Sequence, residues 1–142
     1  MGLPALGCAG LGLATAVAAS VPTLPPGRVS AQTIPALAVA EPGELSLTIL
    51  EPVLPVGAIE VWLESEHVEL PENRLGNDDV VDPLARQPRI RGRFVAPKTP
   101  GEYVVLGHGL YVTCGPRWCR PKRTDVRWMV TVLERDDDDA LP

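Results

Sequence analysis

The chain has 142 residues, of which 45% are hydrophobic and 22% are charged, and this length suits one domain rather than two. Its net charge is -5, with 13 Lys and Arg against 18 Asp and Glu, which excludes a general basic surface for nucleic-acid phosphates. The 16 prolines are spread along the chain, and because proline breaks helices they exclude a bundle of long helices.

Residues 1–31 have the layout of an export signal. Residues 5–21 carry no charge and are rich in Ala, Gly and Leu, and small residues precede a predicted cut after Ala31. Cleavage there removes Cys8, so the odd count of three cysteines becomes one pair. We therefore expect a periplasmic or otherwise extracytoplasmic protein. If the run stays uncut, it approaches the roughly 17 to 25 residues of a membrane span, which would be the chain's only membrane contact.

Residues 32–133 are expected to form one all-β domain, an Ig-like antiparallel sandwich of about seven short strands. Hydrophobic and polar residues alternate there with the period of two that is typical of half-buried strands. The clearest such strands are residues 44–50, 57–65, 89–96 and 125–133. Residues 103–106 and 110–114 are expected to form one or two further strands around Gly107, His108 and Gly109.

Three features lie outside the predicted core. Residues 71–88 are rich in turn formers and predict a long loop, and loops beyond about 12 to 15 residues are often functional or disordered. Residues 134–142 are acidic and predict a solvated, disordered tail. A row formed by Arg89, Arg91 and Arg93 is expected to lie on a solvated face.

The pair Cys114 and Cys119 carries the clearest chemistry. The four residues between them begin with Gly115 and Pro116, so a hairpin loop is expected to bring the cysteines within disulfide reach. A ring this small stabilises a fold by only about 2 kcal/mol, and nearby cations favour the thiolate that exchange requires. The cations in this stretch are Arg117, Arg120, Lys122 and Arg123. A structural disulfide remains the alternative, since most disulfides of exported domains are structural.

These residues resemble the N-terminal periplasmic domain of the thiol:disulfide interchange protein DsbD. That family has a Tyr three residues before its first Cys, a short gap, and then Cys-x-Pro-Pro before the last strands. Tyr111, Cys114, Cys119 and Pro121 match these positions, whereas Lys122 stands where the second Pro is usual. The resemblance covers about the last 45 residues and agrees with the predicted Ig-like sandwich.

The resemblance implies that Cys114 and Cys119 cycle between dithiol and disulfide, which would make the protein a thiol-disulfide oxidoreductase without cofactor or metal. Electrons would come from a separate membrane partner and pass to exported thioredoxin-like proteins. By the same resemblance, Cys119 attacks the partner and Cys114 resolves the mixed disulfide. The residues expected to support the pair are Tyr111, Arg117, Trp118, Arg120 and Pro121. Tyr111 and Trp118 would shield the pair or contact a partner, unless both are ordinary packing residues.

Two other interpretations account for the same residues. A cupredoxin-like copper domain needs two His, a Cys and usually a Met, for which His67, His108, one cysteine and Met129 are the candidates. No His follows either cysteine, so we expect His67 at a strand end and His108 in a turn instead. The other interpretation is a non-catalytic Ig-like interaction module with a structural disulfide, in which Trp62, Trp118 or the arginine row meets a partner.

Overall fold

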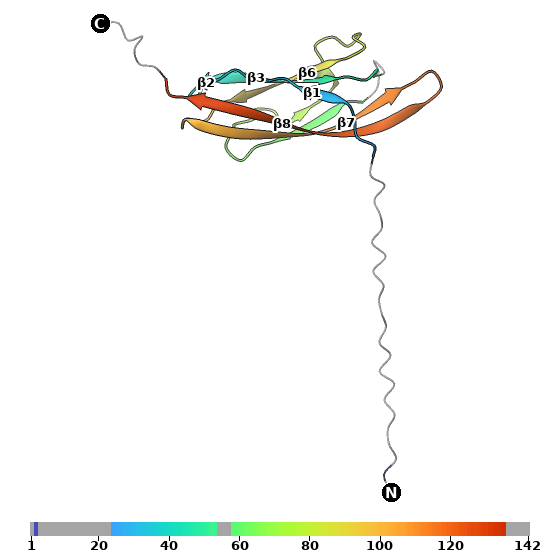
Figure 1. Ribbon diagram of the computed structural model, residues 1–142, viewed down its shortest axis with the longest axis horizontal. Helices are drawn as coiled ribbons and strands as arrows, with labels where there is room; N and C mark the ends of the chain where they lie inside the picture. The colour runs from blue at the N-terminus through green and yellow to red at the C-terminus, as the bar shows by residue number, and fades with distance from the viewer. Residues whose placement is uncertain (1, 3–23, 54–57, 136–142) are drawn as a thin grey trace, which may run out of the picture.

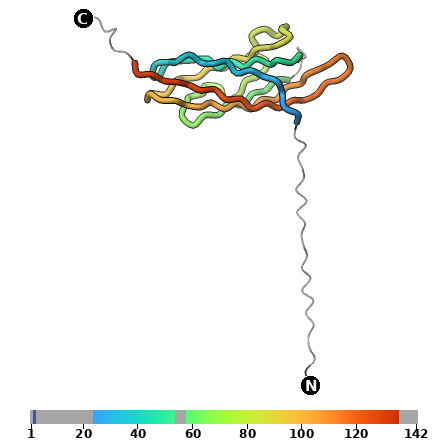
Figure 2. The backbone as a smooth tube through the Cα atoms, in the orientation of Figure 1, coloured from blue at the N-terminus to red at the C-terminus, as the bar shows by residue number. Residues whose placement is uncertain are grey.

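The structure, a computed structural model, describes residues 2, 24–53 and 58–135 (Figure 1). Most of the predicted signal segment and residues 136–142 of the predicted tail lie outside the described residues. The described strands form two sheets that pack into a sandwich (Figure 2), which confirms the expected all-β, Ig-like fold. No helix in the described ranges is long and apolar enough to cross a membrane.

The two sheets differ in size. The smaller sheet has the antiparallel order β1 (Val29–Ala31), β3 (Pro42–Ile49) and β6 (Arg89–Val95). The larger sheet has the order β2 (Leu37–Ala38), β8 (Cys119–Leu133), β7 (Gly101–Cys114), β4 (Glu60–Glu64) and β5 (Arg74–Leu75). Its pairings are antiparallel except the short one between β2 and β8. A single turn of 3-10 helix, η1 (Asn77–Asp79), follows β5.

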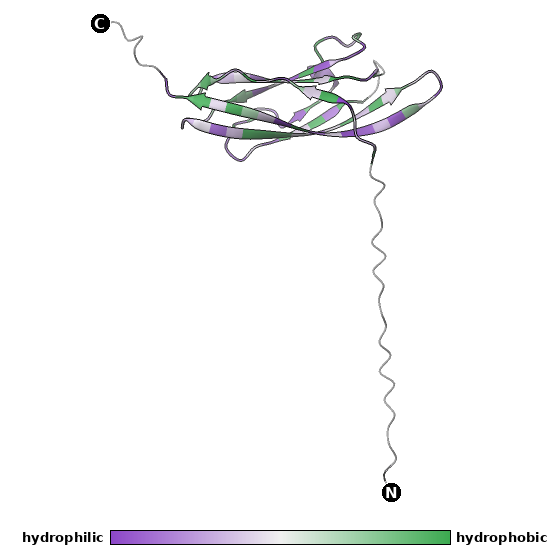
Figure 3. Ribbon diagram, in the orientation of Figure 1, coloured by the Kyte–Doolittle hydropathy of each residue, from purple (hydrophilic) through white to green (hydrophobic). Residues whose placement is uncertain are grey.

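The core lies between the sheets and consists of the inward positions that the alternation predicts. Hydrophobic and hydrophilic residues alternate along the strands (Figure 3), so each sheet buries one face. The inward side chains include Leu45, Leu47, Ile49, Val61, Leu63, Ile90, Phe94, Val130 and Val132. Trp128 joins the two layers, because its buried indole N–H donates a hydrogen bond of 3.2 Å to the carbonyl oxygen of Ser46 on β3.

The predicted break around Gly107 and Gly109 is wrong, because β7 runs through both glycines as one strand. The two glycines do not form a turn. Because they lack a side chain, they leave space for side chains of the neighbouring strand β8. A Cβ on Gly107 would lie 2.7 Å from the Trp128 ring, and one on Gly109 would lie 2.8 Å from the Thr124 methyl carbon. His108 is therefore not the predicted turn residue, since it lies within the strand opposite Asp125.

The last strand is longer than predicted, since β8 begins at Cys119 and not near residue 125. Pro121 does not interrupt it. Trp118 accepts a hydrogen bond from Gly115 across the hairpin, and because bonding directions alternate along a strand, Pro121 directs its nitrogen away from β7. The backbone N–H and C=O groups of Arg123 also point away from β7. The N–H donates to the Pro25 carbonyl, and the C=O accepts from Gly27.

Residues 71–88 are more structured than the predicted loop, because they contain β5 and η1. Backbone and side-chain bonds tie the segment to both sheets. Leu63 donates to the Asn73 carbonyl at 2.7 Å, and the side chain of Asn77 accepts from Ile59 at 2.8 Å. Val81 donates to the Arg89 carbonyl at 2.9 Å, so the segment closes against β4 on one side and β6 on the other.

The residues just before the predicted cut are part of the described sandwich. β1 pairs with residues 47–49 of β3, and an arm formed by residues 24–28 runs beside the hairpin of β7 and β8. Gly27 donates to the Arg123 carbonyl at 2.8 Å, and Leu50 donates to the Arg28 carbonyl at 2.8 Å. Cleavage after Ala31 would remove this arm and β1.

We predict that a chain beginning at Gln32 is less stable than one beginning at Leu24, when both end at Arg135. The shorter chain loses β1 and the backbone bonds of the arm, each of which contributes about 0.5 to 1.5 kcal/mol net. The free energy of unfolding in urea should fall by at least about 2 kcal/mol. Equal free energies would show that the domain does not need the arm.

Candidate functional site

The cysteine pair lies at the tip of the β7–β8 hairpin. Cys114 and Cys119 are opposite each other in the ladder, joined by a disulfide, with Cα atoms 4.1 Å apart. The Gly115 N–H donates a hydrogen bond of 2.9 Å to the Trp118 carbonyl, which leaves Pro116 and Arg117 at the outermost turn. The predicted hairpin and disulfide are confirmed.

The disulfide lies on the outer face of the hairpin. The preceding Thr113 is buried, and its hydroxyl donates to the Pro52 carbonyl at 2.7 Å, so residues 51–53 cover the inner face. Successive side chains alternate between faces, which directs Cys114 outward. Cys114 is half-buried and Cys119 is exposed. The more exposed of the two cysteines is thus the one that the DsbD resemblance assigns as the attacking one.

The tip carries an exposed aromatic ring beside two cations. Trp118 is 46% exposed, and its ring lies over Gly115, where a Cβ would be 2.6 Å from the indole. The guanidinium carbon of Arg120 lies 4.7 Å from the centroid of the Trp118 ring, a cation–π distance. Arg117 and Arg120 are exposed, and neither has a carboxylate within 4.0 Å among the described residues.

The other two cations predicted at this loop are engaged nearer the sandwich. Lys122 lies 3.7 Å from a carboxylate oxygen of Glu51, and both side chains are largely buried. Arg123 lies 3.9 Å from Asp125 on the outer face. Because a carboxylate offsets each of these charges, Arg117 and Arg120 are the two cations of residues 114–123 without a carboxylate within 4.0 Å among the described residues.

Tyr111 faces the interior and cannot contact a partner. It is 2% exposed, and its hydroxyl donates a hydrogen bond of 2.5 Å to Glu51, which lies two residues after the end of β3. Glu51 also accepts from the Arg28 N–H at 3.4 Å. Sequence reasoning missed Glu51, because a single acidic residue before Pro52 gives no sign that 60 residues later a buried tyrosine needs it.

The charges of this buried cluster are fixed by its contacts. Burial alone raises the pKa of Glu51, but the hydrogen bonds from Tyr111 and Arg28 and the charge of Lys122 outweigh burial and lower that pKa. Burial and the hydrogen bond to the Glu51 carboxylate raise the pKa of Tyr111. The cluster therefore holds a carboxylate and a neutral phenol, and it anchors the arm and residues 51–53 to the inner face of the hairpin.

A second titratable cluster lies on the outer face of the larger sheet. His108 on β7 has its Nδ1 atom 2.7 Å from Asp125 on β8 and its Nε2 atom 3.3 Å from Glu64 on β4. The hydrogen bonds to Asp125 and Glu64 raise the pKa of His108. The charged imidazole donates to both carboxylates, whereas the neutral ring has one N–H and donates to only one of them.

The residues proposed for copper do not converge. His108 is six residues before Cys114 on one strand, roughly 20 Å away at the rise of a β-strand. His67 instead packs edge-on against Tyr103, with ring centroids 5.9 Å apart. Both candidate cysteines are in the disulfide, and no group of three His, Cys, Asp or Glu side chains in the described residues is placed to hold a metal.

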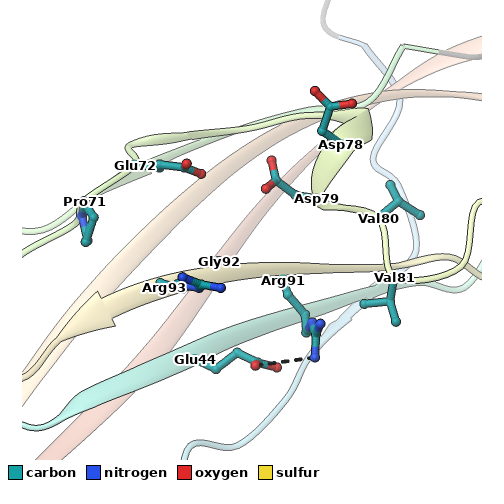
Figure 4. A pocket seen from close by; sticks show the side chains of 10 residues that line it. All are labelled: Glu44, Pro71, Glu72, Asp78, Asp79, Val80, Val81, Arg91, Gly92 and Arg93. Atoms are coloured by element: carbon teal, nitrogen blue, oxygen red, sulfur yellow. Dashed lines mark ion pairs between the residues drawn. The ribbon is translucent and has the colours of Figure 1, made fainter.

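A polar groove of about 680 Å³ lies on the body of the sandwich, against the edge of β6 (Figure 4). Glu72, Asp78 and Asp79 line one wall. Arg91 and Arg93 line the other, and Arg91 lies 3.7 Å from Glu44. The arginine row is thus partly used in this ion pair, and Arg93 is exposed as predicted.

Comparisons with known proteins add little to this geometry. No family model and no curated protein matches the chain. One similar solved structure is that of AggA, the major subunit of aggregative adherence fimbriae type I from Escherichia coli. The two share 11% sequence identity at a TM-score of 0.34, over 76% of this chain and 97% of that one. So distant a likeness carries no weight for function, which has to be inferred from the hairpin itself.

We predict that Tyr111→Phe lowers the free energy of unfolding by about 1 to 3 kcal/mol, because it leaves a buried carboxylate without its hydroxyl donor. It should leave the reactivity of the disulfide unchanged, since the ring faces the other side of the strand. Tyr103→Phe is the matched control, because its hydroxyl bonds only the exposed Thr99 carbonyl. Urea denaturation measures the first effect; an equal loss in the control would contradict it.

We predict that His108 contributes stability that falls as the pH rises. Because its folded pKa is raised, the contribution is complete below the unfolded value of about 6.5 and is lost as the pH passes the folded pKa above it. The pairs are exposed, so the contribution is about 0.2 to 1 kcal/mol. The stability difference between wild type and His108→Gln should shrink from pH 5.5 to pH 8.5. A constant difference would refute this, and Asp125→Asn should weaken the same pH dependence.

Proposed function

We propose that the protein is an exported thiol-disulfide interchange domain that acts through Cys114 and Cys119. The observation that carries the proposal is the position of the disulfide, on the open face of a hairpin tip whose turn carries the exposed Arg117. A reduced thioredoxin-like protein or a membrane electron donor fits such a site, because a partner thiolate has to approach one sulfur in line with the S–S bond.

Exchange starts when a partner thiolate attacks the exposed Cys119 sulfur. The S–S bond breaks, a mixed disulfide with Cys119 forms, and Cys114 leaves as a thiolate. A second partner thiol then attacks the partner sulfur of the mixed disulfide and releases Cys119. The partner dithiol becomes a disulfide, and two electrons and two protons are transferred to the pair. Run in reverse, the reduced pair passes these electrons to an exported acceptor.

The electrostatics of the tip suit this chemistry. Arg117 lies in the turn between the two cysteines, and Arg120 follows Cys119 on the other face of β8. Their positive charge at the tip favours the thiolates that form during exchange, because a nearby cation favours the charged form of a thiol. We expect the hairpin to persist when the bond is reduced. A six-residue ring contributes only about 2 kcal/mol, while the ladder and the Glu51 cluster hold the strands together.

The second candidate function is that of an interaction module whose disulfide is structural. The exposure of Trp118 at the tip favours it, since exposed Trp beside Arg is typical of residues that dominate binding energy at protein interfaces. The two functions differ in the stability of the disulfide against reduction.

We predict a reduction potential above about -300 mV for the pair, in equilibrium with glutathione buffers. The Cys8→Ser chain is the right background, because only Cys114 and Cys119 then titrate. A potential below about -300 mV would identify a structural disulfide and contradict the proposal.

A pair of matched variants tests the role of the arginines. Arg117→Gln with Arg120→Gln should make the potential more negative, on the order of 10 to 30 mV, because the thiolates lose cationic neighbours. Arg86→Gln with Arg93→Gln removes two exposed arginines elsewhere and should leave the potential unchanged. Equal potentials in all variants would show that the arginines have no part in exchange.

A further inference from the structure

We propose that the tip of the β7–β8 hairpin is a membrane-contact site, which places Trp118 at the surface of a bilayer with Arg117 and Arg120 on anionic lipid headgroups. The inference goes beyond thiol exchange and does not rest on it, since it depends on the charge and shape of the tip alone. A disulfide held at the membrane surface would also be within reach of a membrane partner.

The first observation is the shape of the hairpin. The hairpin extends beyond the body of the sandwich, so its turn reaches a flat surface before the sheets do (Figure 1). Pro116, Arg117 and Trp118 form this turn, and all three are exposed. The tip can therefore touch a bilayer without any rearrangement of the fold.

The second observation is the local charge. The chain as a whole has a net charge of -5, which opposes binding to an anionic surface. At the tip the sign is reversed, because residues 114–123 contain four cations and no acidic residue. Arg117 and Arg120 are the two without a carboxylate within 4.0 Å among the described residues. Anionic lipids attract such cations while they repel the rest of the chain, so the charge orients the domain tip first.

The third observation is the exposed indole. Trp118 keeps 46% of its surface accessible, and the guanidinium of Arg120 stacks on its ring. Tryptophan is enriched where a protein meets the headgroup layer, because its ring is apolar and its N–H is polar. An arginine beside it reaches the phosphates at the same depth. The Trp118–Arg120 pair thus matches the chemistry of a lipid headgroup region.

The fourth observation is the course of the chain before the sandwich. Residues 24–28 run beside the hairpin, where Gly27 bonds the Arg123 carbonyl at 2.8 Å. In the sequence, this arm follows the uncharged run of residues 5–21. The run ends three residues before Leu24, so a bilayer that held it would lie near the arm that borders the hairpin. Because stable membrane binding usually needs two signals, the run and the cationic tip would act together.

The test uses the full chain with vesicles of pure phosphatidylcholine and vesicles with 30% phosphatidylglycerol. Bromine-labelled lipids quench a tryptophan that enters the headgroup region, and the difference between wild type and Trp118→Phe isolates the signal of Trp118. Trp62→Phe is the matched control, because Trp62 is 38% exposed but lies on the sheet face. We expect quenching of Trp118 in the anionic vesicles that high salt weakens, and none of Trp62.

Charge variants test the same contact. Arg117→Glu with Arg120→Glu should reduce the apparent affinity of the tip at least about 25-fold, since each cation contributes about fivefold. Arg86→Glu with Arg93→Glu, the same change on the body, should leave Trp118 quenching as in wild type. Unquenched Trp118 on vesicles that retain the chain would show that residues 5–21 bind alone, and it would overturn the proposal. Equal effects of both charge variants would overturn it too.

The reduction potential is measured without lipid, so either proposal can fail while the other stands.

Discussion

The continuous pairing of β7 with β8 is the constraint on which the rest of the molecule depends. All 14 residues of β7 have a partner on β8, from Gly101 opposite Val132 to Cys114 opposite Cys119. One end of this ladder supplies the centre of the larger sheet, and the other end extends beyond it. The position of the cysteine pair is therefore set by core packing, since Trp128, Val130 and Val132 fix the register at the buried end.

One face of the hairpin is buried and the other is open. The Glu51 cluster lies on the buried face. Tyr111 and Lys122 hold Glu51 on the inner face, while the N-terminal arm and residues 51–53 cover it. A buried carboxylate is costly unless it is paired, so this face cannot easily be exposed. The outer face keeps the disulfide accessible. The hairpin thus has one covered face and one open face, and the open face leaves the tip accessible to a partner.

The charge at the tip has the opposite sign to the net charge of -5 of the chain. Some carboxylates of the sandwich lie beside cations, as Glu44 does beside Arg91 and Asp125 does beside His108. The arginines at the tip have no such neighbours among the described residues. In the two proposed roles, these arginines would stabilise thiolates during exchange and would attract anionic surfaces that the acidic chain would otherwise avoid.

Period-two alternation and a Cys-x4-Cys turn are local patterns, so the sandwich, its inward residues and the hairpin disulfide could all be predicted from the sequence alone. The continuity of β7 through Gly107 and Gly109 could not be predicted in this way. These positions need glycine because Trp128 and Thr124 occupy the space where a side chain would lie, and that is visible only in the tertiary structure. The sequence also did not reveal the partners of Tyr111 and His108. The partners of His108 come from two other strands and the partner of Tyr111 comes from the segment after β3. Only the tertiary fold brings a carboxylate 60 residues away within hydrogen-bond distance of the hairpin.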